Sequence, residues 1–144
     1  MSDLDAWIRA AVRRQFVPTA AEVADLRERM ARAPFLSERS LERHLTKRVA
    51  EGQWRPQTSP AEYDTDVHLG VTGSDELVLG TRRGGTVVLA LGRTRALLAA
   101  EKLGAHPLPY LVVIYSGARD RLISGYQYSG AEMIELPEGA IWLR

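Results

Sequence analysis

Two titratable side chains lie one turn apart on the same side of a predicted helix. Over residues 40–63, a helical repeat of about 100° per residue places four polar side chains on one stripe: Ser40, His44, Lys47 and Glu51. Histidine can accept and donate a proton near neutral pH, and a lysine one turn away adds a fixed positive charge. Both suit RNA cleavage, in which a base removes the ribose 2′-OH proton and cations stabilise the doubly charged phosphorane. We expect this stripe to remain available for chemistry.

A predicted strand near the C-terminus, RLISGYQYS, supplies hydroxyl groups and aromatic rings. The period of two along a strand predicts that one face carries Leu122, Ser124, Tyr126 and Tyr128. Ser124 can donate a hydrogen bond to a phosphate oxygen, and either tyrosine can stack on an unpaired base. The helix and the strand together therefore contain the groups that a ribonuclease site needs.

Each of these side chains also has an ordinary structural explanation. Lys47 and Glu51 are four residues apart, so they could form only an exposed ion pair, with His44 as another solvated side chain. Ser124 could form a cross-strand hydrogen bond, and the tyrosines could be partly buried core rings. Spacing alone leaves both explanations open.

The composition limits the classes of protein to which the chain can belong. Its 144 residues, 45% of them hydrophobic, fit one globular domain with a modest core. The absence of cysteine excludes disulfides, thiol nucleophiles and zinc sites with cysteine ligands. The histidines lack HxxxH and HExxH spacing, so we predict no metal site and no cofactor. No apolar run approaches the roughly 20 residues that cross a membrane, so this piece is expected to be soluble.

Charge is distributed unevenly along the chain. The formal net charge of +1 gives no global field that would attract polyanions, but basic residues outnumber acidic ones over residues 1–56. This bias weakly favours a phosphate-bearing partner. Solvated arginines on helix faces are the more ordinary explanation.

The first half of the chain predicts four helices. Apolar residues recur at helical spacing in LDAWIRAAVRRQF and in VADLRERM, and Thr19 with Glu22 forms a capping-box pattern before the second of these segments. For the helix that carries His44, Ser37 is a candidate N-cap, and Gly52 is placed to end it in a left-handed conformation. A second capping box precedes a short fourth helix and consists of Ser59 and Glu62. The apolar ridge of the third helix is Leu41, Leu45 and Val49.

The second half predicts strands. ELVLGTRR and TVVLALG, joined by a Gly84-Gly85 turn, have the pattern of a hairpin. PYLVVIYSG is apolar at nearly every position, as expected of a strand covered on both faces, and the residues ARD turn the chain into the strand that carries Ser124. The segment RTRALLAAEKLG could be a short helix or an irregular crossover.

The C-terminal tail AEMIELPEGAIWLR could add an edge strand, which Pro137 and Gly139 would interrupt. The sequence thus predicts an α+β fold, in which N-terminal helices are followed by, and packed on, an antiparallel sheet of about four strands.

Two parts of the sequence carry a family resemblance. The string His44-Leu45-Thr46-Lys47, followed by Trp54, Thr58 and Glu62-Tyr63, resembles the pattern H-F-x-K-H, aromatic, T-x-x-E-Y of the barnase-EndoU-colicin-RelE-like (BECR) ribonuclease toxins. YLVVIYSGARDRLISGYQY resembles the closing hairpin of that group. The resemblance covers about residues 37–130. It implies a division into an N-terminal helical extension, 1–36, and a BECR-like domain, 37–144.

The resemblance implies a site for metal-independent RNA cleavage. His44 matches the helical histidine of the group, Lys47 the cation, Ser124 the strand hydroxyl and Tyr126 the aromatic residue after it. The usual threonine is Ser124, and the second histidine of the group is Arg48, which can grip phosphate but cannot act as an acid at neutral pH. Three residues are predicted to bind substrate: Arg48, Arg82 and Tyr128. Arg83 beside Arg82 is a further candidate for phosphate contacts.

By the same resemblance, the chain would be a bacterial toxin domain with an RNA substrate and a cognate immunity or antitoxin protein. It would act in the cytoplasm, delivered as part of a larger secreted toxin. The alternative is a catalytically inactive module of a phage or mobile element that uses the same sheet to bind nucleic acid or protein. A third possibility is a protein-interaction adaptor built on the N-terminal helices, with the Trp7 face as the docking surface.

Overall fold

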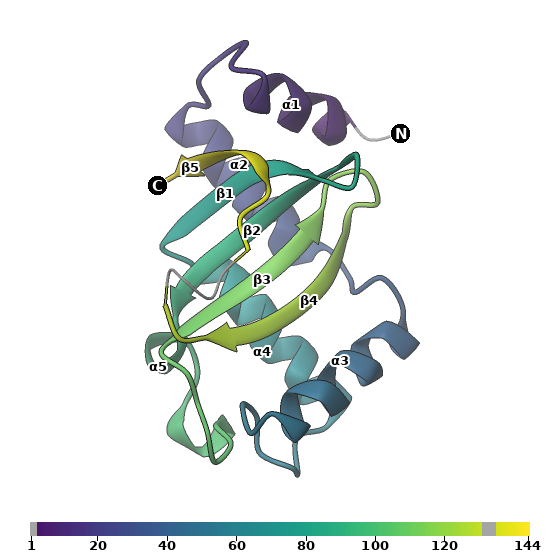
Figure 1. The fold of residues 1–144 in the computed structure, drawn as a ribbon, viewed down its shortest axis with the longest axis vertical. Helices are drawn as coiled ribbons and strands as arrows, with labels where there is room; N and C mark the ends of the chain where they lie inside the picture. The colour runs from purple at the N-terminus through teal and green to yellow at the C-terminus, as the bar shows by residue number, and fades with distance from the viewer. Residues whose placement is uncertain (1–2, 131–134) are drawn as a thin grey trace.

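The computed structural model describes residues 3–130 and 135–144, and it combines an antiparallel sheet with a set of helices (Figure 1). Within these residues the sheet has five strands in the order β4-β3-β2-β1-β5. The strands are β1 (Glu76–Arg82), β2 (Gly85–Arg93), β3 (Tyr110–Ser116), β4 (Arg121–Tyr128) and β5 (Glu138–Leu143). The predicted α+β class is confirmed. The sheet has one strand more than predicted, because the C-terminal tail adds β5 beside β1.

The four predicted helices all precede the sheet. They are α1 (Asp3–Val12), α2 (Ala20–Arg32), α3 (Glu38–Ala50) and α4 (Pro60–Thr72). Between β2 and β3 the chain forms a short helix and a 3₁₀ turn, α5 (Thr94–Leu97) and η1 (Ala100–Lys102). The segment that could have been a helix or an irregular crossover is therefore a crossover with two short helical pieces.

Capping boxes fix where α2 and α4 begin. The Thr19 hydroxyl accepts a hydrogen bond from the Glu22 N–H at 3.1 Å, and the Glu22 carboxylate accepts one from the Thr19 N–H at 3.0 Å. Ser59 and Glu62 form the same reciprocal pair at 3.1 and 3.0 Å. Each box satisfies N–H groups that a helix start leaves without partners. Both predicted boxes are confirmed.

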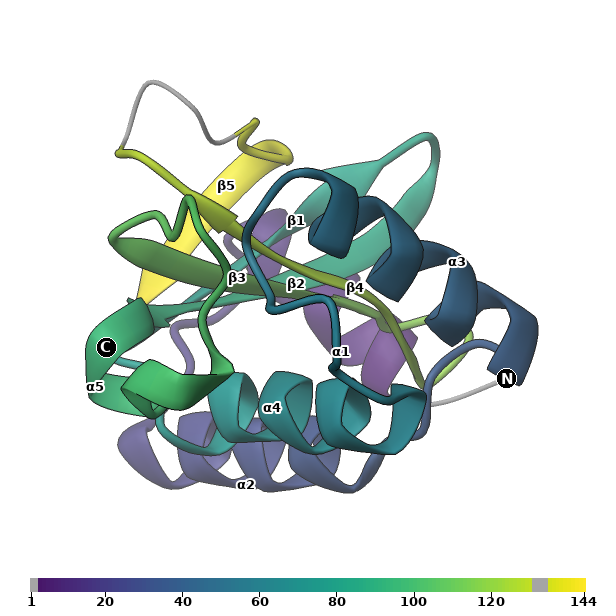
Figure 2. The same ribbon diagram turned by 90° about the horizontal axis from the view of Figure 1, so that it is seen from below.

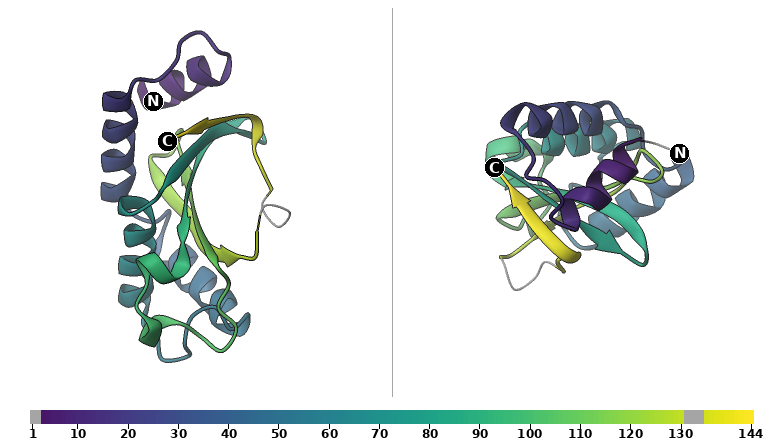
Figure 3. Two further views of the ribbon diagram at one scale, coloured as in Figure 1. Left: turned by 90° about the vertical axis from the view of Figure 1, so that its left-hand side faces the viewer. Right: turned by 90° about the horizontal axis from the view of Figure 1, so that it is seen from above.

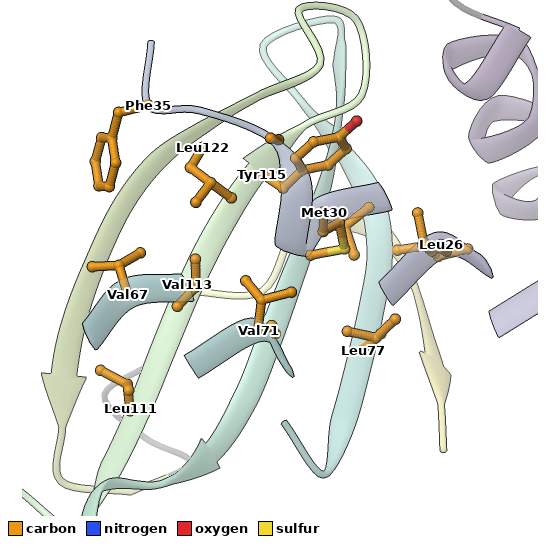
Figure 4. Packing of buried hydrophobic residues seen from close by; sticks show 14 of the residues in the cluster. Leu26, Met30, Phe35, Val67, Val71, Leu77, Leu111, Val113, Tyr115 and Leu122 are labelled. Carbon is orange, nitrogen blue, oxygen red and sulfur yellow. The ribbon is translucent and has the colours of Figure 1, made fainter. Parts of the chain in front are cut away.

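Helices α2 and α4 cover one face of the sheet, which we call the packed face (Figures 2 and 3). Helix α1 packs against β1 and β5, and residues of α1 and α2 belong to the same core as those of α4 and the strands. Figure 4 shows part of this core: Leu26, Met30, Phe35, Val67, Val71, Leu77, Leu111, Val113, Tyr115 and Leu122. The first 36 residues therefore share their hydrophobic core with the rest of the chain.

The sheet curves away from α2 and α4, so its second face is concave (Figure 3). A second apolar cluster fills the centre of this concave face: Val78, Leu89, Leu91, Val112 and Tyr128. Val112 is fully buried here, while its neighbours Leu111 and Val113 are fully buried on the packed face. The prediction that β3 is covered on both faces is confirmed.

A β-bulge in β4 changes which side chains share a face. Ser124 pairs with Ile114, but Leu122 pairs with Tyr115, so Ile123 is an extra residue in β4. Leu122 therefore points into the packed face, whereas Ser124 lies on the concave face. The prediction that both residues share one face is wrong, because it assumed an unbroken period of two.

The β1–β2 hairpin turns one residue earlier than predicted. Arg82 pairs with Gly85, which leaves Arg83 and Gly84 as the two turn residues, with φ angles of 52° and 80°. Two positive φ values in succession are typical of the tight turns that suit the twist of a hairpin. Gly85 is the first residue of β2, so the turn is Arg83-Gly84 rather than Gly84-Gly85.

The structure shows where the two residues predicted to interrupt the C-terminal strand lie relative to β5. Pro137 comes directly before β5, and Gly139 within β5 has a φ of 68° where the register with β1 shifts by one residue. The prediction for the start of the tail concerns residues 131–134, which lie outside the described residues. Among the residues that the structure describes, no helix has both the length and the apolar composition needed to cross a membrane.

Candidate functional site

Helix α3 lies along the edge strand β4, so one side of the helix faces the sheet (Figures 1 and 2). Ser37 caps its start by accepting a hydrogen bond from the Ser40 N–H at 3.0 Å, and Gly52 follows its end with a φ of 76°. The predicted apolar ridge anchors the helix: Leu45 is buried, and Leu41 and Val49 pack against the core. The ridge fixes the rotation of α3 and so directs its polar stripe toward β4.

The structure brings His44 and Ser124 into contact. His44 Nδ1 lies 3.3 Å from Ser124 Oγ, although 80 residues separate them in sequence. The Arg48 guanidinium donates to the same Ser124 oxygen at 3.4 Å. Three of the residues predicted for the site therefore meet at one hydroxyl group.

Arg48 is buried and engaged on three sides. One guanidinium nitrogen donates to the Glu51 carboxylate at 2.7 Å, another to Ser124, and the guanidinium carbon lies 5.2 Å from the centre of the Tyr126 ring. Its Nε is buried without a hydrogen-bond partner among the described residues. Glu51 therefore pairs with Arg48, three residues away, and the ion pair between Lys47 and Glu51 that spacing allowed is not formed.

The polar stripe predicted on α3 is only partly available to a ligand. Ser40 is buried, whereas Lys47 is exposed and His44 is intermediate. Ser40 lies in the first turn of α3, on the side of the helix that faces β4, and its side chain is not accessible to a ligand. The prediction that the whole stripe is available is wrong for Ser40.

Burial lowers the pKa of His44 to about 4, and the nearby positive charges of Arg48, Arg43 and Lys47 act in the same direction. The imidazole is therefore neutral at pH 7. With the ring proton on Nδ1, His44 donates to Ser124 Oγ, and the lone pair of Nε2 remains to accept a proton. With the opposite tautomer, Ser124 donates to Nδ1 and Nε2 carries the proton.

A pair of glutamines fastens the end of α3 to β4. The Gln53 amide binds both main-chain groups of Gln127, donating to its C=O at 3.1 Å and accepting from its N–H at 2.8 Å. The Gln127 amide in turn donates to the Gln53 C=O at 2.9 Å. Gln53 thus takes the place of a neighbouring strand on the exposed edge of β4. Sequence reasoning missed this pair, because a side chain that pairs with a distant main chain leaves no periodic signal.

Tyr63 fixes the same strand from the packed face. Its hydroxyl donates to the Gly125 C=O at 2.6 Å, and the ring packs edge-on against Trp54 at a centroid distance of 5.1 Å. Burial raises the pKa of Tyr63 to about 12, so the hydroxyl stays protonated as this bond requires. Tyr63 therefore holds the backbone directly after Ser124.

A cavity of about 370 Å³ opens between the end of α3 and β4. We call it the tyrosine cavity; it is lined by Lys47, Arg48, Glu51, Gln53, Leu108, Tyr126, Gln127, Tyr128 and Ser129. Lys47 is the exposed cation at this cavity, and Tyr126 presents a half-buried ring. Tyr128 is 8% exposed and packs on Tyr110 at a centroid distance of 5.3 Å, so it belongs mainly to the concave-face cluster.

Arg82 reaches the concave face from the end of β1. Its guanidinium donates to the Glu135 C=O at 2.5 Å. Burial raises the pKa of Tyr126, and the charges of Arg82 and Arg48 act in the opposite direction, so both arginines lie near this ring. Arg82 is therefore on the same face as the His44 site but lines a different cavity.

The other two histidines lie outside this site. The ring nitrogens of His68 are each 2.7 Å from a carbonyl oxygen, those of Asp64 and Ala33, so His68 joins α4 to the end of α2. His106 is exposed in the loop before β3. Within residues 3–130 and 135–144, no group of three or more His, Asp or Glu side chains is arranged to hold a metal ion.

The site that the structure assembles thus combines a neutral histidine, a hydroxyl, a buried arginine and a tyrosine, with an exposed lysine beside them. Comparisons of this chain with models of protein families, with curated proteins and with solved structures found no match.

Proposed function

We propose that this chain is a metal-independent endoribonuclease of the BECR toxin type. The reaction would be attack of a ribose 2′-OH on the adjacent phosphorus, with release of the 5′-oxygen and formation of a 2′,3′-cyclic phosphate. The observation that carries the proposal is the 3.3 Å contact between His44 Nδ1 and Ser124 Oγ, with the positive charges of Arg48, Arg43 and Lys47 near the imidazole. Such a contact fixes the orientation of the imidazole and leaves its second nitrogen, Nε2, to exchange a proton with a substrate.

His44 is the general base in this proposal. Its lowered pKa, about 4, means that the ring already carries a free lone pair at neutral pH. In this role His44 donates its Nδ1–H to Ser124 Oγ, and the unprotonated Nε2 can then take the 2′-OH proton. Because Ser124 is buried, with 5% of its surface exposed, it orients the ring and does not attack the substrate itself.

The cations divide into two roles. Arg48 is neutralised by Glu51 and held against Ser124 and Tyr126, so it positions the site. Lys47 is exposed at the edge of the tyrosine cavity and stabilises the negative charge that develops on the phosphorane.

Tyr126 is the proton donor to the leaving 5′-oxygen. Burial raises its pKa, so its hydroxyl is protonated at neutral pH, and Arg48 lies against its ring. This assignment supplies the acid that Arg48 cannot provide, since a guanidinium does not release a proton at neutral pH. The base and the acid are then different groups, as the two proton transfers require.

A toxin of this type acts on RNA in the cytoplasm and needs a cognate immunity protein. The basic groups around the site favour an acidic inhibitor that covers Lys47 and the neighbouring cavity. Delivery within a larger secreted toxin belongs to the same proposal.

One observation favours a second candidate function, a catalytically inactive binding module with the same fold. Arg48 stands where the group has its second histidine, and its guanidinium is already occupied by Glu51, Ser124 and Tyr126. Such a module would hold RNA or protein on the concave face without cleaving it.

An RNA-cleavage assay with and without EDTA separates the two functions. We expect cleavage in EDTA, products that end in 2′,3′-cyclic phosphate, and a rate reduced at least about a hundredfold by His44→Ala, the usual contribution of acid-base catalysis. His106→Ala is the matched control, because it removes an exposed histidine that packs on Gly52 rather than on Ser124, and its rate should be unchanged.

Three outcomes contradict the proposal: equal rates for His44→Ala and the wild type, cleavage only after a metal is added, or no cleavage at all. The last result, combined with retained RNA binding, would identify the inactive module. Tyr126→Phe tests the proposed acid separately, since it keeps the ring beside Arg48 and removes only the hydroxyl.

A further inference from the structure

A second cavity, of about 360 Å³, lies on the concave side of the sheet next to Ser124. We call it the arginine cavity; its lining is Arg82, Arg83, Gly85, Thr86, Val87, Ile114, Ser116, Ala118, Arg119 and Ile123. Ile114 is the direct cross-strand partner of Ser124, and Ile123 is the bulge residue immediately before it. The cavity therefore adjoins the His44–Ser124 contact on the side opposite the tyrosine cavity.

Three arginines from two hairpins surround this cavity. Arg82 and Arg83 come from the β1–β2 hairpin, and Arg119 comes from the turn between β3 and β4. In the described part of the chain, the guanidinium groups of Arg83 and Arg119 make no hydrogen bond or ion pair that would neutralise them. None of the lining residues is acidic. The cavity thus carries a concentrated positive charge that suits an anionic ligand.

The floor of the cavity is apolar. Val87, Ile114 and Ile123 supply branched aliphatic surface, and Ile114 and Ile123 are only partly buried. A simple inorganic anion gains nothing from such a floor. A ligand with both a flat apolar part and a negative charge, such as a nucleotide, matches the floor and the arginines together.

The two cavities lie along the same strand with the His44–Ser124 contact between them. From Ile123 to Tyr126 the strand advances by about 10 Å, at roughly 3.3 Å per residue. A single nucleotide cannot occupy both cavities over that distance. A flexible strand of three or more nucleotides can, with one of its phosphates at His44.

We propose that the arginine cavity binds a nucleotide next to the cleaved bond, so that the preferred substrate is single-stranded RNA spanning both cavities. The unpaired base rests on Ile114 and Ile123, and its phosphate contacts Arg83 and Arg119. A duplex keeps its bases stacked and paired, so it cannot place one in the cavity without melting. This inference rests on the proposed ribonuclease function, whose site it extends.

The test measures binding to the His44→Ala protein, which carries the complete arginine cavity. Fluorescence anisotropy in EDTA would compare labelled oligouridylates of two and six nucleotides and a duplex of six base pairs. We expect the hexamer to bind at least ten times more tightly than the dimer and the duplex. Adding Arg83→Ala and Arg119→Ala should remove most of that advantage and leave dimer binding unchanged.

The control carries Arg13→Ala and Arg95→Ala, because these exposed arginines lie outside both cavities and their loss changes the net charge equally. The Arg83/Arg119 variant should also lower the slope of log Kd against log salt by about 0.7, the value for one neutralised phosphate on a single strand. The control should keep that slope. Thermal melting of both variants would show whether each is folded.

Equal weakening by the control pair would overturn the inference, because it would show a general charge effect. Equal affinity for the hexamer and the duplex would also overturn the inference. Tight binding to an acidic protein, without binding of the hexamer, would overturn it as well. If the wild-type chain cleaves no RNA but the Arg83/Arg119 variant loses hexamer binding, the ribonuclease proposal fails and the nucleotide subsite stands. If the chain cleaves RNA and the variant binds the hexamer normally, only the subsite fails.

Discussion

The two faces of the sheet are built from different kinds of residue. Apolar side chains from α1, α2 and α4 interdigitate with the strands on the packed face, where most of the large side chains are completely buried. The concave face has a small apolar centre, and hydroxyl, aromatic and arginine side chains surround it. A chain with one fully packed face does not need its second face for stability to the same degree. The concave face can therefore expose polar groups at little cost to folding.

The largest expected effect of a substitution comes from breaking the packed face. Leu79→Ala removes a fully buried side chain of the core and leaves a cavity, so we expect the free energy of unfolding to fall by about 2–5 kcal/mol. Urea denaturation measures this change. Leu69→Ala, at a leucine that is 44% exposed on α4, is the control and should cost well under 1 kcal/mol.

Leu79→Ala should not alter RNA cleavage when the assay temperature is well below the melting temperature. A parallel loss of stability and of kcat/KM at low temperature would mean that the two faces are not independent. That result would remove the distinction drawn between them.

A smaller loss of stability is expected from a substitution at β4, the edge strand where the two faces of the sheet meet. Gln53→Ala leaves the main-chain N–H and C=O of Gln127 without partners, and both groups are buried, so we expect a loss of about 2 kcal/mol. Gln57→Ala, at an exposed glutamine four residues later, should be close to neutral. Hydrogen exchange at the Gln127 amide measures the change locally, and unchanged protection would show that Gln53 does not hold the strand.

The smallest expected effect on stability concerns the pH dependence that His44 gives the concave face. The pKa of its ring falls from 6.5 to about 4 on folding, so the unfolded chain binds more protons between these values. The contribution of His44 is thus complete above pH 6.5 and is lost as the pH falls toward 4. Because the ring is only half-buried, we expect a loss of about 2 kcal/mol or less.

Urea denaturation of the wild type and of His44→Asn between pH 4 and 7 measures this linkage. The stability of the wild type relative to that of His44→Asn should fall as the pH falls from 6.5 toward 4. RNA cleavage by the wild type should decline on the acid side near pH 4. A decline centred near pH 6.5 would mean that the His44 environment differs from the one described.

Local features of the fold could be predicted from the sequence. The two capping boxes and the N-cap at Ser37 depend on residues three positions apart, and the structure has all of them. The apolar ridge of α3 was equally clear, because helical periodicity is a property of one segment. From these patterns one could predict where the helices start and which side of α3 faces the core.

The candidate site was harder to predict, because its contacts join distant segments. The spacing identified His44 and Ser124 as candidates but could not show that they touch. Glu51 is one turn from both Lys47 and Arg48, and the choice of Arg48 depends on which cation β4 buries. Gln53 gave no signal, since the main chain of Gln127 that it binds has no sequence signature.

The single extra residue in β4 uncouples the spacing along the chain from the face of the sheet that a side chain occupies. Leu122 and Ser124 are two residues apart and yet lie on opposite faces, because Ile123 is the additional residue between them. Removing Ile123 would restore an even alternation and would keep Leu122 opposite Tyr115 and Ser124 opposite Ile114, so the Ser124 side chain would still face His44. Homologues that keep this site can therefore carry either one residue or none between the apolar residue of the packed face and the serine, and a search for such sites in other sequences has to allow both spacings.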